Sequence, residues 1–177
     1  MLVMGEAEMK RTISRIAHEI LERNAQSIAA GNLGLVGIKR RGVPLTQRLA
    51  REIKTAAGAD LPLGELDITL YRDDLQMVAA APIVRGSKIE FDLNGKVVVL
   101  VDDVLFTGRT IRAAISELLD FGRCQAIQLA ALVDRGHREL PIAADYVGKV
   151  IQTEPGDLVD IKVKEEDGED GVFLTRK

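Results

Sequence analysis

Apolar and polar residues follow two different periods along this chain, and the longer period predicts three helices. They cover residues 8–29, 44–57 and 111–121, where apolar side chains recur every three or four positions. Pro44 stands at the first turn of the second helix, where its missing N–H removes no hydrogen bond. Each helix therefore has one apolar face to bury against a neighbouring element.

Between the helices lie short runs with few polar side chains, which is typical of strands in a sheet that is buried on both faces. These runs cover residues 33–38, 97–101 and 126–133, and a further strand is predicted over residues 66–71. Shorter strands surround turns from Tyr146 onward. Because strands and helices alternate, we expect an α/β fold with a mostly parallel central sheet and helices on both faces.

The composition is that of one ordinary domain. The chain has 177 residues, of which 46% are hydrophobic, enough for one full core. No apolar run approaches the roughly 18 residues of a membrane span, and the first residues lack the charge order of a secretion signal. The single cysteine, Cys124, cannot form an internal disulfide and fits a reducing compartment, so a cytoplasmic location is expected.

The charges are unevenly distributed. The formal net charge is −3, but residues 154–170 alone carry eight acids and two lysines, a net of −6, so the remainder carries +3. A uniformly basic surface that coats nucleic acid is excluded, whereas a local basic face is not. The Cys and His spacings suggest no structural zinc, and no Ser/His/Asp set suggests a nucleophilic triad.

The most informative segment is VVVLVDDVLFTGRT, residues 97–110. A buried strand is followed by two carboxylates, Asp102 and Asp103, then by the turn Thr107–Thr110 and a helix. Backbone N–H groups and the positive end of a helix dipole hold a phosphate dianion, while carboxylates accept hydrogen bonds from sugar hydroxyls. An acid pair alone is often part of a solvated loop, and TGRT alone could be a helix cap. In this order, at the carboxyl end of a strand, they predict a site for a phosphorylated sugar.

Three further segments lie just past predicted strand ends. Residues 39–42 place three cations before a glycine, which forms either a solvated loop or a grip for a pyrophosphate leaving group. The loop over residues 73–92 is long for a compact domain, and such loops are often lids or disordered. Residues 134–141 face the place where a base would sit.

Residues 97–110 resemble the motif by which phosphoribosyltransferases of the type I fold bind 5-phosphoribosyl-1-pyrophosphate (PRPP). With further segments the resemblance narrows to the PyrR family, in order from about residue 8 to 150, while the acidic C-terminal part matches only loosely. The segments are IAHEI (16–20), VGIKRRG (36–42), LDITLYRDDL (66–75), VDDVLFTGRT (101–110) and LVDRGHRELPIAADYVGK (132–149). Members of that family are bifunctional: they are uracil phosphoribosyltransferases, and they attenuate the pyrimidine operon by binding leader RNA.

The resemblance implies a single type I phosphoribosyltransferase domain over residues 1–177, with a small hood and a flexible lid loop. The implied reaction is uracil plus PRPP giving UMP and diphosphate, with Mg²⁺ bound through PRPP near the acid pair and no direct protein ligand. The implied catalytic residues are Asp102, Asp103 and Arg72. The residues expected at PRPP are Lys39, Arg40, Arg41, Asp102, Asp103, Val104, Leu105, Phe106, Thr107, Gly108, Arg109 and Thr110, with Val133, Asp134 and Arg135 at the base.

The resemblance also implies an RNA-binding face that includes the first helix. Polar side chains there lie opposite the apolar stripe, and an ordinary solvated face is the alternative interpretation. With 3% aromatic residues, stacking platforms for bases are not expected. The residues placed on the RNA face are Ser14, Arg15, His18, Arg23, His137, Arg138 and Lys149. The implied partners are the leader mRNA, bound in the presence of UMP, and a second copy of the chain in a homodimer or larger homo-oligomer.

Three positions depart from the family pattern. Phe106 stands where tyrosine is usual, Arg40 where threonine is common and Ala143 where an arginine is usual. The missing cation at Ala143 concerns the RNA face rather than the sugar site. Two alternatives stay open: a phosphoribosyltransferase for another base without a regulatory role, and an RNA-binding regulator whose catalysis is dispensable.

Overall fold

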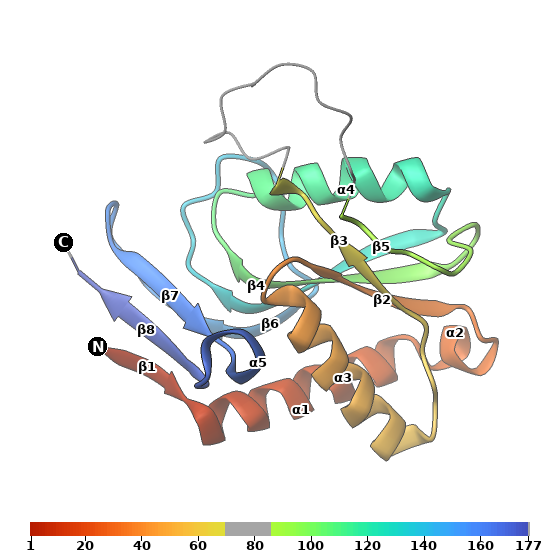
Figure 1. The fold of residues 1–177 in the computed structure, drawn as a ribbon, viewed down its shortest axis with the longest axis horizontal. Coiled ribbons are helices and arrows are strands. Elements are labelled where there is room, and N and C mark those ends of the chain that lie inside the picture. The colour runs from red at the N-terminus through yellow and green to blue at the C-terminus, as the bar shows by residue number, and fades with distance from the viewer. Residues whose placement is uncertain (70–85, 177) are drawn as a thin grey trace.

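The computed structural model describes residues 1–69 and 86–176, with a five-stranded parallel sheet and a three-stranded antiparallel sheet (Figure 1). The strand order of the large sheet is β3-β2-β4-β5-β6, so β4 is central. This confirms the predicted α/β class. The strands of the large sheet are β2 (Leu33–Ile38), β3 (Leu63–Leu66), β4 (Val97–Leu105), β5 (Ala126–Asp134) and β6 (Tyr146–Val150).

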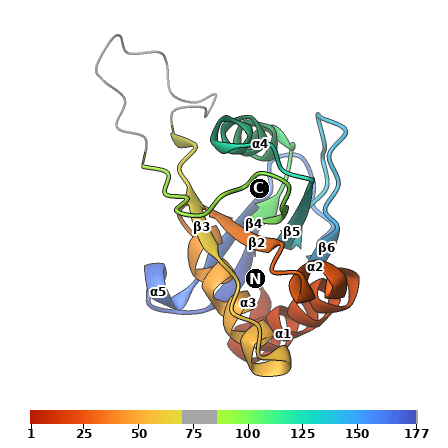
Figure 2. The same cartoon turned by 90° about the vertical axis from the view of Figure 1, so that its right-hand side faces the viewer.

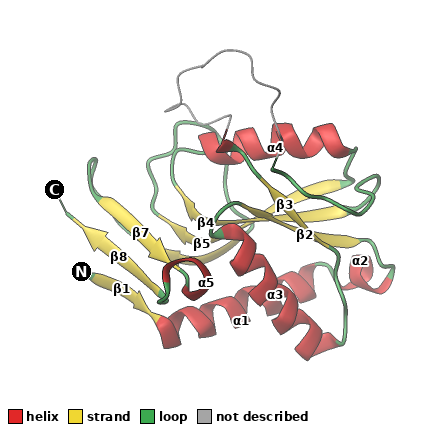
Figure 3. Ribbon diagram, viewed as in Figure 1, coloured by secondary structure: helices red, strands yellow, loops and turns green. Residues whose placement is uncertain are grey.

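Helices cover both faces of the large sheet, which gives the layers visible in Figures 2 and 3. On one face lie α1 (Glu6–Arg23), α2 (Ala25–Ala29) and α3 (Gly42–Ala57), and on the other lies α4 (Arg109–Phe121). Alternate residues of β4 divide the core, because successive strand side chains point to opposite faces. Val97, Val99 and Val101 pack with α1 and α3, whereas Val98 and Leu100 pack with α4.

The small sheet brings the two ends of the chain together. Strand β1 (Leu2–Gly5) pairs with β8 (Gly171–Thr175), which pairs with β7 (Leu158–Lys162). The short helix α5 (Lys164–Asp167) lies between β7 and β8. Figure 1 shows this unit, the hood, on the side of the large sheet where β2 and β4 end. No helix in the described part of the chain is long and apolar enough to cross a membrane.

The predicted helix over residues 8–29 is in fact two helices, α1 and α2. The break falls at Asn24, whose buried side chain donates hydrogen bonds to Gln128 Oε1 at 3.0 Å and Tyr146 Oη at 2.9 Å. These bonds tie the end of α1 to β5 and β6. The apolar periodicity gave no sign of them, because they depend on residues about a hundred positions away.

The predicted strand over residues 66–71 also differs: β3 lies earlier, at Leu63–Leu66, in parallel with residues 35–38 of β2. The chain turns after Leu66 because Asp67 Oδ1 accepts hydrogen bonds from the backbone N–H and the hydroxyl of Thr69. Strand β1 was not predicted. Strand β4 runs on past Val101 to Leu105, so the acid pair belongs to the strand rather than following it.

Candidate active site

Two adjacent carboxylates lie near the end of the central strand. Asp102 is 6% exposed and Asp103 is half-buried. Each accepts a hydrogen bond from the next amide: the N–H of Asp103 donates to Asp102 Oδ1 at 2.9 Å, and the N–H of Val104 donates to Asp103 Oδ1 at 2.8 Å. Because β4 pairs with β2 on one side and β5 on the other, the acid pair has a fixed place in the sheet.

Burial raises the pKa of Asp103, because its carboxylate loses hydration. The hydrogen bond with Asp102 and the positive charge of Arg41 oppose that rise. A ligand that brings positive charge or hydrogen-bond donors to the pair offsets the cost of burial. The pair is therefore suited to sugar hydroxyls, to a hard cation, or to a carbon atom that becomes cationic.

The turn after β4 presents the N-terminus of α4. Gly108 caps this helix with a φ of 92°, in the left-handed region that favours glycine. A Cβ atom at Gly108 would lie 3.3 Å from Leu140 and 3.4 Å from Ile142, so a larger residue would crowd the neighbouring loop. The first turn of α4 contains no acidic residue, which leaves the positive end of its dipole to an external anion.

The loop that follows β5 braces this turn. The carbonyl oxygen of Thr107 accepts hydrogen bonds from the N–H groups of Glu139 at 2.9 Å and Leu140 at 3.1 Å. The Glu139 side chain accepts a hydrogen bond from Arg109 Nε at 2.6 Å. The structure thus joins the residues predicted to hold a phosphate to the segment predicted to face a base.

The cationic loop between β2 and α3 passes directly beside the acid pair. A Cβ atom at Gly42 would lie 2.5 Å from the carbonyl oxygen of Val101, so only glycine allows this approach. Val101 precedes Asp102 in β4. The loop predicted to bind pyrophosphate therefore approaches the carboxylates predicted to bind the sugar, and the charge of Arg41 acts on Asp103.

Each cation of this loop forms an ion pair with a carboxylate that was not predicted at the site. The pairs are Lys39 with Glu65 at 3.5 Å, Arg40 with Glu166 at 3.5 Å and Arg41 with Asp167 at 2.9 Å. Lys39 Nζ also donates a hydrogen bond to the carbonyl oxygen of Gly86 at 2.5 Å. Two of the carboxylates belong to α5 and to the acidic segment 154–170, and that uneven charge distribution was the only signal of this contact.

The segment predicted to face the base begins beside the acid pair, since Val133 of β5 lies opposite Val104 of β4. Arg135 is only 7% exposed, and its guanidinium carbon lies 4.1 Å from the centroid of the Phe106 ring. Within the described residues, its buried Nε has no hydrogen-bond partner. Buried donors are nearly always satisfied, so this N–H is a candidate to serve a ligand.

The residues predicted to contact RNA fall into two groups. The first is Ser14, Arg15, His18 and Arg23 of α1 with Lys149 of β6, and the second is His137 and Arg138 of the loop after β5. The His137 ring meets the Phe106 ring edge-on, with centroids 6.2 Å apart. Arg138 pairs with Asp134 at 2.5 Å. The second group therefore borders the candidate active site.

Cations of the first group form hydrogen bonds and ion pairs within the chain. Arg15 donates hydrogen bonds to the carbonyl oxygens of Val147 at 3.1 Å and Gly148 at 2.6 Å, so it lies along β6. The ion pairs of this group are Arg15 with Glu19 at 2.5 Å, Arg23 with Asp145 at 2.8 Å and Lys149 with Glu8 at 2.7 Å. The arginine side chains remain half exposed, at 47% for Arg15 and 52% for Arg23.

Arg72, the remaining predicted catalytic residue, and most of the predicted loop over 73–92 lie outside the described residues. Hydrogen bonds connect the described segments that precede residue 70 and follow residue 85. Glu65 and Lys88 form an antiparallel bridge. The Ser87 hydroxyl accepts a hydrogen bond from the N–H of Asp67 at 2.8 Å and donates one to the buried Glu117 of α4.

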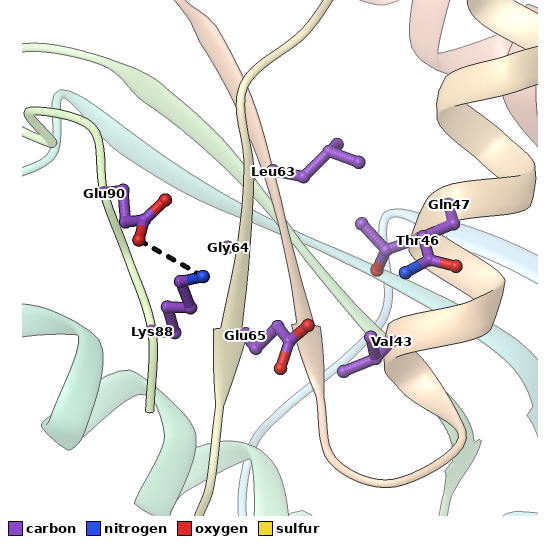
Figure 4. A pocket seen from close by; sticks show the side chains of 8 residues that line it. All are labelled: Val43, Thr46, Gln47, Leu63, Gly64, Glu65, Lys88 and Glu90. Carbon is purple, nitrogen blue, oxygen red and sulfur yellow. Dashed lines mark ion pairs between the residues drawn. The ribbon is translucent and has the colours of Figure 1, made fainter. Parts of the chain in front are cut away.

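A cavity of about 140 Å³ lies between α3 and the β3 edge of the sheet (Figure 4). Its polar lining includes Glu65, Lys88 and Glu90, and the last two form an ion pair at 3.2 Å. None of the residues predicted to bind substrate lines it. The residues predicted to bind substrate therefore lie outside this cavity, at the strand-end surface around the acid pair.

An acid pair and a glycine-capped helix at the carboxyl end of a parallel sheet define a phosphoribosyltransferase of the type I fold. The model of the phosphoribosyl transferase domain family matches residues 6–166. The hypoxanthine phosphoribosyltransferase of Trypanosoma cruzi shares this fold, with a TM-score of 0.76 at 17% identity over 99% of this chain and 91% of that chain. A hypoxanthine-guanine phosphoribosyltransferase from Bacillus anthracis has a TM-score of 0.69 at 16% identity over 97% and 94%.

Similarity to sequence relatives identifies one family within this class of phosphoribosyltransferases. The bifunctional protein PyrR of Pelotomaculum thermopropionicum is 54% identical over 97% of this chain and 93% of its own length. That of Deinococcus deserti is 56% identical over 97% and 92%, and that of Thermus aquaticus 55% over 99% and 95%. The chain belongs to the PyrR family, which confirms the resemblance found in the sequence.

Proposed function

We propose that this chain transfers the 5-phosphoribosyl group of PRPP to uracil, giving UMP and diphosphate. The observation that carries the proposal is the meeting of Asp102 and Asp103 with the glycine-capped N-terminus of α4, in a member of the PyrR family. The carboxylates match the ribose hydroxyls. The helix N-terminus, with residues Thr107–Thr110, matches the 5′-phosphate.

The electrostatics of the site suit glycosyl transfer. The bond from ribose C1 to the diphosphate oxygen breaks, a bond from C1 to N1 of uracil forms, and the N1 proton passes to the released diphosphate. Positive charge grows on the ribose and negative charge on the diphosphate, as in other glycosyl transfers. Asp102 and Asp103 accept hydrogen bonds from the 2′- and 3′-hydroxyls, and their charge favours the cationic ring. Positioning and charge suffice, so no covalent intermediate is required.

The leaving diphosphate is assigned to Lys39, Arg40 and Arg41. The site also fits Mg²⁺, a hard cation that prefers oxygen ligands. Within residues 1–69 and 86–176 no three His, Cys, Asp or Glu side chains gather as a metal site. We assign Mg²⁺ to oxygens of PRPP beside Asp102 and Asp103. When bound, Mg²⁺ would offset the negative charge of the diphosphate.

Uracil is assigned to the start of the loop after β5, against backbone groups of Val133 and Asp134 and the side chain of Arg135. The N–H at Arg135 Nε, which has no acceptor among the described residues, suits a base edge rich in carbonyl oxygens. Uracil presents such an edge.

We further propose that the chain binds the leader mRNA of the pyrimidine operon when UMP occupies the site. The outer face of α1 with Lys149 provides the contact. Its arginines sit in half-exposed ion pairs, which contribute only about 0–1 kcal/mol each and exchange readily for phosphate oxygens. The His137 ring contacts the Phe106 ring, and Arg138 Nη1 donates a hydrogen bond to the Phe106 carbonyl oxygen at 2.7 Å, so both residues lie where nucleotide occupancy can influence RNA binding. A homodimer would present two such faces.

The direct test of the catalytic proposal is a steady-state assay of diphosphate release with PRPP and a panel of free bases. Uracil should support turnover, whereas hypoxanthine, guanine and adenine should not. Turnover with a purine and none with uracil would assign the site to another base. RNA binding without turnover on any base would favour the regulator whose catalysis is dispensable.

A further inference from the structure

Asp167 of the hood forms a two-point hydrogen-bonded ion pair with the guanidinium of Arg41 in the cationic loop. Asp167 Oδ2 accepts a hydrogen bond from Arg41 Nε, and Oδ1 accepts one from Nη2, each at 2.9 Å. Such two-point contacts fix the plane and direction of a guanidinium. Among the described residues no acceptor is bonded to Arg41 Nη1, so that nitrogen keeps its donors for an anion.

The carboxylate itself is fixed by its own helix. Asp167 Oδ2 also accepts a hydrogen bond from the N–H of Val163, the residue at the start of α5, at 2.8 Å. The bond with Arg41 lowers the pKa of Asp167 to about 2, so the group is ionised at neutral pH. A rotation of this carboxylate would break its hydrogen bonds with Arg41 and with the Val163 N–H. The carboxylate therefore sets where Arg41 points.

A second ion pair of the hood has the same construction but a different target. Asp170 Oδ1 accepts a hydrogen bond from the N–H of Lys164 at 2.7 Å, and both Asp170 oxygens accept from Arg48, at 2.7 and 3.0 Å. Arg48 lies within α3, beyond the cationic loop, and its side chain is 14% exposed. This pair fastens the hood to α3 and provides a matched structural control.

We propose that Asp167 is a positioning residue for the diphosphate of PRPP, acting through Arg41. It holds one edge of the guanidinium so that the other faces the diphosphate beside Asp102 and Asp103. The inference rests on the proposed function, since it takes residues 39–41 as the diphosphate site. It gives the hood a part in substrate binding that the loose sequence match of the C-terminal region did not suggest.

The test is the affinity of the full-length protein for Mg²⁺-diphosphate, by titration calorimetry, together with steady-state kinetics. Asp167→Asn should weaken diphosphate binding about tenfold and raise KM for PRPP by a similar factor. It should leave KM for uracil unchanged and kcat within about twofold. Asp170→Asn should lower thermal stability but leave diphosphate affinity at the wild-type value.

A thermodynamic cycle shows whether Asp167 acts through Arg41. In an Arg41→Ala background, the additional change Asp167→Asn should have no further effect on diphosphate affinity. Asp167→Ser serves as a second variant if Asp167→Asn fails to fold. Tighter diphosphate binding in Asp167→Asn would instead make Asp167 a competitor of the substrate, and equal losses in the Asp167 and Asp170 variants would reduce it to a structural brace.

These outcomes are separate from a failure of the proposed function. Diphosphate titration needs no base, so a protein inactive with uracil still reports whether Asp167 positions Arg41. A wild-type protein that turns over uracil but shows no loss in Asp167→Asn would overturn the inference and leave the function standing.

Discussion

The guanidinium carbon of Arg135 lies 4.1 Å from the centroid of the Phe106 ring, which joins the loop after β5 to the turn after β4. Phe106 is 40% exposed, and its ring covers Arg135, a residue that is 7% exposed. A cation over an aromatic face contributes about 0.5–2 kcal/mol. Phe106 therefore fixes a side chain assigned to the base, although it belongs to the PRPP motif.

Phe106→Ala should raise KM for uracil about 2- to 30-fold, because Arg135 loses the ring that holds it. KM for PRPP should change less, and Phe106→Tyr, which keeps the ring, should behave like the wild type. Steady-state kinetics with each substrate varied in turn measures both constants. An unchanged KM for uracil in Phe106→Ala would show that the ring has no part in base binding.

Asp103→Asn should lower kcat for UMP synthesis by about 10²- to 10³-fold, since the variant removes a charge that stabilises the cationic ribose. At saturating UMP its affinity for leader RNA should equal that of the wild type, because Asp103 is not among the residues assigned to RNA. Asp60→Asn, a change at a carboxylate that is 77% exposed, is the control and should leave both activities intact. Parallel loss of turnover and RNA affinity in Asp103→Asn would contradict the separation of the two sites.

The same variant should be more stable than the wild type at neutral pH. Burial raises the folded-state pKa of Asp103 above the ordinary value of 3.8, so the native state binds this proton more tightly than the unfolded chain does. Ionisation therefore costs folding free energy above the folded pKa, and the cost disappears below the ordinary value. Thermal unfolding should show a higher Tm for Asp103→Asn at neutral pH and a gap that closes in acid. A difference in Tm that widens in acid would mean that folding lowers the pKa of Asp103 instead of raising it.

The double variant Arg15→Ala and His18→Ala should bind leader RNA more weakly and reduce the dependence of affinity on salt by about one phosphate contact. Turnover of uracil should be unchanged. Because Arg15 also bonds to backbone carbonyls of β6, His18→Ala alone is measured beside it. Lys54→Ala, which removes an exposed cation from the end of α3, is the charge-matched control. A gel-shift titration of the double variant that matches the wild type would remove this face from RNA binding.

The fold could be predicted from the sequence because its elements have periodic signals. The bounds of β2, at residues 33–38, agree with the prediction, and the apolar run that begins at Val97 correctly predicts the buried central strand. The elements that were missed lack such signals. Strand β1 is short and pairs with the far end of the chain, and the break at Asn24 comes from side-chain bonds to β5 and β6.

The site likewise combines features that have a local sequence signal with contacts between distant residues. The order of strand, acid pair, glycine turn and helix placed Asp102 and Asp103 near the carboxyl end of the central strand and Gly108 before a helix, because these are local features of the chain. It missed that β4 continues through the acid pair to Leu105. The hold of Asp167 on Arg41 spans 126 positions along the chain, and no local pattern encodes a contact of that range. The acidic segment was recognised only as a charge imbalance, whereas in the fold it supplies the partners of Arg40 and Arg41.

The measurement that tests the central claim most directly is a crystal structure of the protein with Mg²⁺ and PRPP in the absence of a base. We predict the 5′-phosphate at the N-terminus of α4, within the turn Thr107–Thr110, and the ribose hydroxyls on Asp102 and Asp103. The diphosphate should lie against residues 39–41. PRPP bound away from the acid pair, for example in the cavity beside β3, would contradict the account.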